Sequence, residues 1–299
     1  MRVASRPIVT YITAMWIAHT VEELRQQRKA LPGSVAFVPT MGALHAGHLS
    51  LVDAGLKLAA SVIVSIYVNP TQFGPSEDFT KYPRTLASDL AMCESAGAAG
   101  VFCPTNEVMY PPHVLECAVN IPALATILEG EFRPGHFAGV CRVVAKLLNM
   151  VQPDVACFGR KDLQQLRVIE AMADDLAMPV RIVGCPTLRE QDGLAMSSRN
   201  RYLTPELRKR GLGLFAALRQ ARAMVEEQGE SDPHAIEAAM RTVLLAHHVE
   251  VQYAALRHPR TLLSIDCVEP KVTGGVAAVI AGKVESVRLI DNLILGEAQ

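Results

Sequence analysis

Short apolar runs alternate with longer stretches of helical periodicity along the first part of the chain. The apolar runs are rich in β-branched residues, as expected of buried strands, and they cover residues 35–40, 61–68, 155–159 and 180–186. Between them, residues 137–150 and 161–178 repeat apolar side chains on one helical face. Strands that alternate with helices predict an α/β fold with a Rossmann-like, doubly wound parallel sheet. Ligands of such sheets bind beyond the carboxyl ends of the strands, so we expect the site there.

After residue 188 the pattern changes. Thr204 and Pro205 provide an N-cap and a proline at the first helical position, and they open a helix predicted to reach about Gln228. A second helix is predicted to start near residues 231–233. Strands are predicted at 249–257, 276–281 and 286–295, with a turn at 274–275. We therefore expect a Rossmann-like domain of residues 1–188, which would hold the strand-end site, and a smaller α+β domain of residues 189–299.

Composition narrows the class of protein. Hydrophobic residues make up 50% of the chain and charged residues 20%, which is typical of a globular protein. The 29 Lys and Arg residues balance the 30 Asp and Glu residues, so neither a nucleic acid nor a membrane is expected as a partner. The seven cysteines form no C-x-x-C pair, which argues against zinc and indicates reduced thiols in the cytoplasm. No signal-peptide pattern is present, and translation from Met1 or from Met15 fits the sequence equally.

The segment 38–48, Val-Pro-Thr-Met-Gly-Ala-Leu-His-Ala-Gly-His, follows a predicted strand and precedes a helix predicted at 49–60. Its glycines suit a tight turn and a close approach of phosphate to the backbone, and the helix N-terminus attracts anions. His45 and His48 lie three residues apart and can donate hydrogen bonds to one phosphate. A bare histidine pair is more often incidental or metal-binding, but the surrounding strand, turn and helix favour phosphate.

Residues 45–48 resemble the His-x-Gly-His signature of the nucleotidylyl transferase superfamily, which includes class I aminoacyl-tRNA synthetases. The whole segment 39–48 resembles the pantothenate synthetases in particular, as do further segments that follow in the expected order. The resemblance implies catalytic roles for His45, His48 and Lys161. It also implies that ATP contacts Thr40, Met41, Gly42, His45, Gly47 and His48.

The next family-like segment is 68–74, Val-Asn-Pro-Thr-Gln-Phe-Gly. It lies at the carboxyl end of a predicted strand, where the Gln72 amide can hydrogen-bond a substrate hydroxyl or carboxylate; an ordinary polar turn is the alternative. The resemblance implies that Gln72 and Asn69 bind pantoate or β-alanine. It also places Asp89 near the Mg²⁺ of the nucleotide, where a solvated helix residue is the alternative.

The segment 158–166 again joins a strand end to a helix start. Lys161 in a first helical turn opposes the helix dipole, which indicates a bound anion, although a surface lysine is the alternative. Gln165 lies one turn further along the same face. The resemblance implies that Gln165 binds pantoate, and that ATP contacts Gly159, Lys161 and Asp162. The family pattern has Glu where this chain has Arg160, so no role is assigned to that side chain.

The segment 192–203 resembles the family's counterpart of the mobile Lys-Met-Ser-Lys-Ser loop of class I synthetases. Its two hydroxyls and one guanidinium suit a triphosphate, whereas Ser-Ser-Arg alone is typical of an ordinary loop. Gly193 supplies a hinge. The resemblance adds these ATP contacts: Leu188 at the adenine, Met196, Ser197, Ser198 and Arg199. Arg133 and His136, in another family-like stretch, are expected at the substrate cavity or in a structural loop.

The resemblance as a whole implies an enzyme that condenses (R)-pantoate with β-alanine to pantothenate, AMP and diphosphate through a pantoyl-adenylate, in coenzyme A biosynthesis. It implies ATP and Mg²⁺ as cofactors and a homodimer as the assembly. Two alternatives stay open: another nucleotidylyl transferase of cofactor biosynthesis, and a nucleotide-binding module without turnover. Phosphate motifs do not separate these possibilities, and only Gln72 and Gln165 with their contexts favour pantoate.

Overall fold

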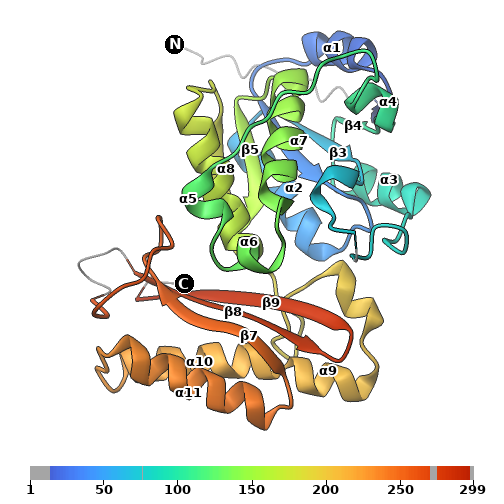
Figure 1. Ribbon diagram of the computed structural model, residues 1–299. Coiled ribbons are helices and arrows are strands. Elements are labelled where there is room, and N and C mark those ends of the chain that lie inside the picture. The colour runs from blue at the N-terminus through green and yellow to red at the C-terminus, as the bar shows by residue number, and fades with distance from the viewer. Residues whose placement is uncertain (1–13, 76, 270–274, 297–299) are drawn as a thin grey trace, which may run out of the picture.

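The computed structural model describes residues 14–75, 77–269 and 275–296, so Met1 and Gly274 lie outside the described residues. Two sheets organise this part of the chain (Figure 1). All strands of the larger sheet are parallel. In spatial order they are β1 (Trp16–Ala18), β4 (Gly100–Phe102), β3 (Ser61–Ile66), β2 (Val35–Thr40), β5 (Val155–Gly159) and β6 (Arg181–Cys185). The prediction of a doubly wound parallel sheet is confirmed.

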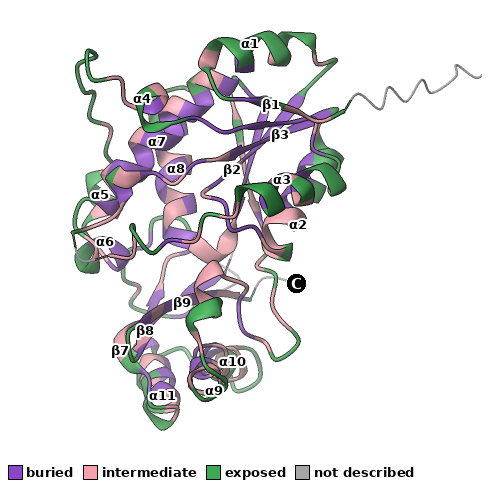
Figure 2. Cartoon of the chain, turned by 90° about the vertical axis from the view of Figure 1, so that its right-hand side faces the viewer, coloured by how far each residue is buried: buried purple, intermediate pink, exposed green. Residues whose placement is uncertain are grey.

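Helices cover both faces of this sheet because alternate strand residues point to opposite sides. On β2, Phe37 packs with α1 (Val21–Ala30), α7 (His136–Val151) and α8 (Leu163–Asp175). Its neighbour Val38 packs on the other face, with α2 (Ala46–Leu58) and α3 (Leu86–Ser95). Three single-turn helices complete this lobe: α4 (Asn106–Met109), α5 (Pro122–Ala125) and α6 (Glu129–Phe132). The strands are largely buried and the outer helix faces are exposed (Figure 2).

The strand order reverses between β2 and β5. From β2 the chain moves through β3 and β4 toward one edge, and β5 and β6 then extend the sheet toward the other edge. Such a reversal leaves a crevice beyond the strand ends that the connecting loops do not fill, and ligands bind there. The histidine segment follows β2 and the Lys161 segment follows β5, so these two segments flank the crevice.

The C-terminal sheet is antiparallel, in the order β7 (Glu250–Arg257), β8 (Val276–Val284) and β9 (Val287–Leu295). One face packs on α10 (Gly213–Glu226) and α11 (Pro233–Ala246), and the other faces the large lobe (Figure 1). Residue alternation accounts for this: Ala278 belongs to the helix-side core, and its neighbour Val279 belongs to the core of the large lobe. A smaller α+β unit is therefore present, while a domain division after residue 188 stays a prediction.

Two helix boundaries differ from expectation. The single helix predicted from Pro205 to Gln228 is wrong, because α9 (Pro205–Gly211) and α10 are separate helices. Glycine is a weak helix former, and a β-carbon at Gly213 would lie 2.5 Å from the His247 β-carbon, so close packing excludes a better helix former there. Helix α2 begins at Ala46 rather than Leu49. The histidine segment itself therefore forms the first turn of that helix.

Candidate active site

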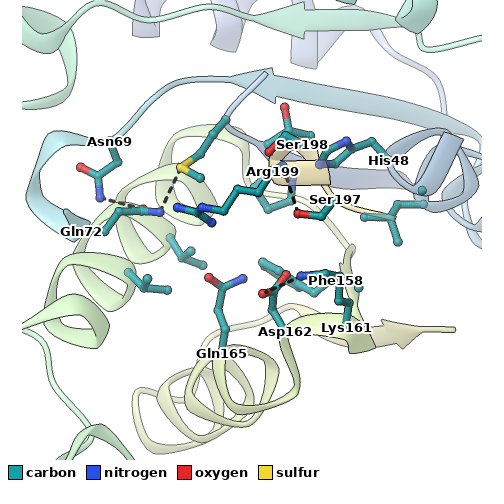
Figure 3. A pocket seen from close by; sticks show the side chains of 18 of the residues that line it. His48, Asn69, Gln72, Phe158, Lys161, Asp162, Gln165, Ser197, Ser198 and Arg199 are labelled. Atoms are coloured by element: carbon teal, nitrogen blue, oxygen red, sulfur yellow. Dashed lines mark hydrogen bonds and ion pairs between the residues drawn. The ribbon is translucent and has the colours of Figure 1, made fainter. Parts of the chain in front are cut away.

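Four separated segments meet in one cavity of about 230 Å³ at the carboxyl end of the parallel sheet. The predicted site residues that line it are Thr40, Met41, His45, Gly47, His48, Asn69, Gln72, Gly159, Lys161, Asp162, Gln165, Leu188, Met196, Ser197, Ser198 and Arg199. Figure 3 shows His48 and Ser197–Arg199 on one side, facing Lys161, Asp162 and Gln165 on the other. Asn69 and Gln72 close one end of the cavity (Figure 3).

Two predicted residues, Gly42 and Asp89, do not line this cavity. Asp89 is only 1% exposed, and it accepts hydrogen bonds from the backbone N–H groups of Ala43 (3.0 Å) and Leu44 (2.8 Å). The Thr85 hydroxyl donates to the same carboxylate. Gly42 has φ +80°, a conformation that favours glycine. Asp89 thus braces the turn that carries the histidines, and this placement gives no support to its predicted role at Mg²⁺.

The two histidines sit at the N-terminus of α2, His45 as its N-cap and His48 in its first turn. The His45 backbone N–H donates to His48 Nδ1 (3.3 Å), so a neutral His48 carries its proton on Nε2. The ring centroids are 4.1 Å apart. A β-carbon at Gly47 would lie 2.9 Å from the His45 ring and 3.5 Å from the Met196 β-carbon. Glycine is therefore required where the histidine turn meets the 196–199 segment.

Both rings are uncharged near neutral pH. Burial, reinforced by the charge of Lys161, lowers the pKa of His45 to about 4. Burial, reinforced by His45, lowers the pKa of His48 to about 3. His45 Nδ1 is buried and has no hydrogen-bond partner, an arrangement that costs free energy unless a ligand supplies one. The pair can therefore offer neutral N–H donors to a ligand in the cavity.

Lys161 and Arg199 bring permanent positive charge into the cavity. Lys161 lies in the 3-10 turn η2 (Arg160–Asp162), and its Nζ is 3.8 Å from Asp162 Oδ1. Arg199 lies in the turn η3 (Ser198–Tyr202) and pairs with Asp78 through two hydrogen bonds of 2.9 and 3.2 Å. The cavity thus holds these two cations, each with a carboxylate nearby, together with the neutral imidazoles.

Asn69 and Gln72 form the polar end of the cavity. Asn69 is the N-cap of the turn η1 (Pro70–Gln72) and Gln72 is its last residue, and Asn69 Nδ2 donates to Gln72 Oε1 (3.1 Å). Gln72 Nε2 contacts Met41 Sδ at 3.0 Å, a weak acceptor that a ligand oxygen can replace. The backbone of α7 touches this turn, because a β-carbon at Gly139 would lie 2.3 Å from the Thr71 carbonyl oxygen. Helix α7 therefore fixes the position of the glutamine.

Arg133 and His136 were expected either at the substrate cavity or in a structural loop. They line the cavity and also hydrogen-bond to the segments around it. His136 Nδ1 lies 2.8 Å from the Gln72 carbonyl oxygen, so that nitrogen must carry the proton. His136 Nε2 then accepts from Arg133 (3.1 Å), which itself forms a two-point ion pair with Glu77. Burial, followed by the charge of Arg133, lowers the pKa of His136 to about 4. The network holds the backbone of Gln72 in place.

An apolar wall was missed by sequence reasoning. The side chains that form it include Val140, Val143, Val144, Leu147 and Phe158. The periodicity of α7 correctly predicted one apolar face, but periodicity does not distinguish a face buried in the core from one that lines a ligand cavity. Tyr82 was missed as well, and its hydroxyl lies 3.4 Å from Ser198 Oγ.

A glycine-containing strand-to-helix turn at the reversal of a parallel sheet, with cations and imidazoles facing a polar-ended apolar chamber, is typical of a nucleotide-binding α/β protein of the transferase or ligase type. Comparison with known proteins narrows this class. The family model described as Pantoate-beta-alanine ligase matches residues 16–294. The chain therefore belongs to the pantoate–β-alanine ligase family.

Individual relatives agree with this assignment. The chain is 47% identical to the pantothenate synthetase of Chloroflexus aggregans, with 94% of this chain and 100% of that protein covered. It is 48% identical to the bifunctional pantoate ligase/cytidylate kinase of Synechococcus elongatus, covering 92% of this chain but only about half, 52%, of the relative. Among solved structures, pantothenate synthetase from Thermus thermophilus has a TM-score of 0.87 at 45% identity, covering 93% of this chain and 99% of that one.

A second solved structure is the pantoate-beta-alanine ligase of Francisella tularensis complexed with beta-gamma ATP and beta-alanine. It has a TM-score of 0.76 at 32% identity and covers 94% of this chain and 98% of that one. In the part of the chain that the structure describes, no helix has the length and apolar character needed to cross a membrane.

Proposed function

We propose that this protein condenses (R)-pantoate with β-alanine at the expense of ATP, forming pantothenate, AMP and diphosphate through an enzyme-bound pantoyl-adenylate. The observation that carries this proposal is the meeting of His48, Lys161 and Ser198 in one cavity that also holds Gln72 and Gln165. The first three suit a triphosphate and the two amides suit a hydroxy acid. Related proteins of the same family bear names that describe this reaction.

In the first step, a carboxylate oxygen of pantoate attacks the α-phosphorus of ATP, and the bond to diphosphate breaks. Negative charge then concentrates on the phosphoryl oxygens, and preorganised donors stabilise that charge without rearrangement. His45 and His48 would donate neutral N–H groups to these oxygens. Lys161 would offset their charge, while Ser197, Ser198 and Arg199 would hold the departing diphosphate.

In the second step, the amine of β-alanine attacks the acyl carbon of the adenylate, loses a proton and displaces AMP, so an amide bond replaces the mixed anhydride. The polar end of the cavity suits this step, because Gln72 and Asn69 can hold hydroxyl and carboxylate oxygens. The valines of α7 would accept the aliphatic part of pantoate. The protein supplies position and charge and needs no covalent nucleophile.

Mg²⁺ belongs to this proposal as part of the substrate, bound to the triphosphate. Among the residues that the structure describes, no group of three or more His, Cys, Asp or Glu side chains is arranged to hold a metal ion. Asp162 lines the cavity beside Lys161 and is better placed for the metal complex than the enclosed Asp89. A homodimer in the cytoplasm completes the proposal, on the family resemblance alone.

Product analysis tests the function. Purified protein with ATP, Mg²⁺, pantoate and β-alanine should yield pantothenate, AMP and diphosphate in equal amounts. Without β-alanine, diphosphate and pantoyl-adenylate should form in amounts close to the enzyme concentration. A nucleotidylyl transferase of another pathway would leave pantoate unchanged, and a binding module would bind ATP without producing AMP; either result refutes the proposal. Sedimentation of the purified protein tests the homodimer separately.

A further inference from the structure

Asn292, in strand β9 of the C-terminal sheet, reaches across to the turn that carries Lys161. Its Nδ2 donates hydrogen bonds to the carbonyl oxygens of Arg160 (3.0 Å) and Lys161 (2.7 Å). The residue is only 7% exposed, so water does not readily replace these bonds. One amide from the small lobe therefore fixes the backbone of two successive residues in the large lobe.

Asn292 is itself held in place. Its backbone N–H donates to Asp291 Oδ1 (2.8 Å), and Asp291 forms a two-point ion pair of 2.7 and 3.0 Å with Arg189. Arg189 also donates to the carbonyl oxygen of Asn292 (3.4 Å), and its guanidinium lies 4.0 Å from the centroid of the Phe215 ring. These contacts fix the backbone from which the Asn292 side chain projects.

The same arginine connects to the serine-containing loop. Arg189 Nη1 donates to the Gly193 carbonyl oxygen (3.1 Å), and Arg189 pairs with Ala195 in an isolated β-bridge. The loop that begins at Arg189 leads directly into Ser197 and Ser198. One continuous set of hydrogen bonds thus runs from the backbone of Lys161, through Asn292 and Asp291, to the loop that lines the opposite side of the cavity.

We propose that Asn292 is a positioning residue that sets the Lys161 turn at its working distance from the 197–199 loop. This inference rests on the proposed function and deepens it, because it names a residue outside the cavity on which the adenylation step depends. Asn292 does not line the cavity that holds Lys161 and the histidines, and it contacts that site through the backbone of the Lys161 turn; it lines a neighbouring pocket with Lys161, Asp162 and Gln165. A turn displaced by about 1 Å would carry the ammonium away from the phosphates, and such displacements reduce rates by up to about a hundredfold.

A double-mutant cycle on formation of pantoyl-adenylate tests this role. Asn292→Ala should lower kcat for this step about tenfold or more and leave the Kd of pantoate within about twofold of the wild-type value. In a Lys161→Ala background, Asn292→Ala should lower this rate less than about twofold, because the ammonium group that Asn292 positions is already absent. If Asn292→Ala lowers the rate by the same factor in the wild-type and Lys161→Ala backgrounds, the proposal is overturned. An unchanged rate in Asn292→Ala would overturn it as well.

An isosteric variant separates positioning from packing. Asn292→Asp keeps the size of the side chain but replaces the N–H donor by an oxygen that repels the two carbonyls, so its rate should fall at least as far as that of Asn292→Ala. It also serves in the cycle if the alanine variant fails to fold, as judged by thermal unfolding. Asn149→Asp is the matched control: Asn149 Nδ2 donates to the Ala145 carbonyl oxygen (2.8 Å) on α7. A wild-type rate in Asn292→Asp would overturn the proposal.

The outcome separates two kinds of failure. If the wild-type protein forms no pantoyl-adenylate, the proposed function is wrong. If the wild-type protein is active and the Asn292 variants are equally active, only the positioning role is wrong.

Discussion

The Arg199 guanidinium and the Asp78 carboxylate form a two-point ion pair, at 2.9 and 3.2 Å, that joins the serine-containing loop to the segment after β3. Burial opposes the charge of Arg199, but the bonds to Asp78 outweigh that effect and raise its pKa. Bidentate pairs of this kind fix direction as well as charge. Asp78 therefore orients the guanidinium that is proposed to hold the diphosphate.

Removal of the Asp78 charge should weaken the interaction of Arg199 with the triphosphate of ATP. We expect Asp78→Asn to lower kcat/KM for ATP about tenfold, since the arginine remains but loses its orientation, and Arg199→Ala to lower it about a hundredfold or more. Steady-state kinetics at several ATP concentrations measure both. Glu285→Gln, which breaks the surface pair with Arg210, is the matched control and should have no effect. An increase in kcat/KM for Asp78→Asn would show instead that Asp78 competes with the triphosphate for Arg199.

The tautomer of His48 leads to a prediction that distinguishes its two nitrogens. Because Nδ1 accepts from the backbone, Nε2–H is the group available to phosphate. His48→Ala should lower the rate of adenylate formation by about 10²–10³, or about 2.7–4 kcal/mol. The amide nitrogen of His48→Gln can take the place of Nε2, whereas that of His48→Asn takes the place of Nδ1, so the glutamine variant should retain more activity. Single-turnover measurements rank the variants, and the reverse order would contradict this assignment.

Gln72 should discriminate between the two substrates. Loss of hydrogen bonds to a charged ligand costs about 1.5–3 kcal/mol, so Gln72→Ala should raise the Kd of pantoate about ten- to a hundredfold and that of ATP less than about twofold. Gln72→Glu should weaken pantoate further, because two carboxylates would then face each other. Titration calorimetry measures both ligands, with Gln26→Glu on the exposed surface of α1 as the control. Equal losses for both substrates would remove Gln72 from the pantoate site.

The free energy of unfolding should fall on acidification, over a pH range that the pKa values of the buried histidines determine. Their pKa values fall from the ordinary 6.5 to about 4, 3 and 4 for His45, His48 and His136. The unfolded chain therefore binds more protons below about pH 6.5, so the stabilisation is complete above that pH and is lost progressively toward pH 4 and below. Thermal unfolding between pH 8 and 4 measures the trend. His136→Asn should make the stability less dependent on pH. His234→Asn, at an exposed position, should leave the pH dependence unchanged.

The sequence predicted the architecture because periodicity and strand-to-helix alternation are local signals, and the parallel sheet follows from them. It also predicted which segments meet in the cavity, since each of them is a contiguous motif at a strand end. It did not predict the break between α9 and α10 or the bracing role of Asp89. Both depend on contacts between distant segments: Gly213 against His247, and the Asp89 carboxylate beneath the Ala43 backbone. The valines of α7 were predicted to share one apolar helical face but not to face a ligand.

The neutrality of the histidines was equally beyond sequence reasoning. Two histidines beside a lysine suggest a cluster of positive charge, and only the burial of the rings shows that they remain uncharged. The site therefore combines a small number of true cations with oriented dipoles.

Gly139 gives the chamber its dimensions. A single hydrogen atom at this position lets helix α7 rest directly on the turn at Thr71, and a methyl group would lie 2.3 Å from the carbonyl oxygen there and 2.8 Å from the Gln72 α-carbon. The distance between the valines of α7 and the Gln72 amide is thus set by contact between two backbone segments and not by adjustable side chains. A chamber built in this way has little room to adapt, so homologous acids that are longer by one carbon should be rejected by its shape.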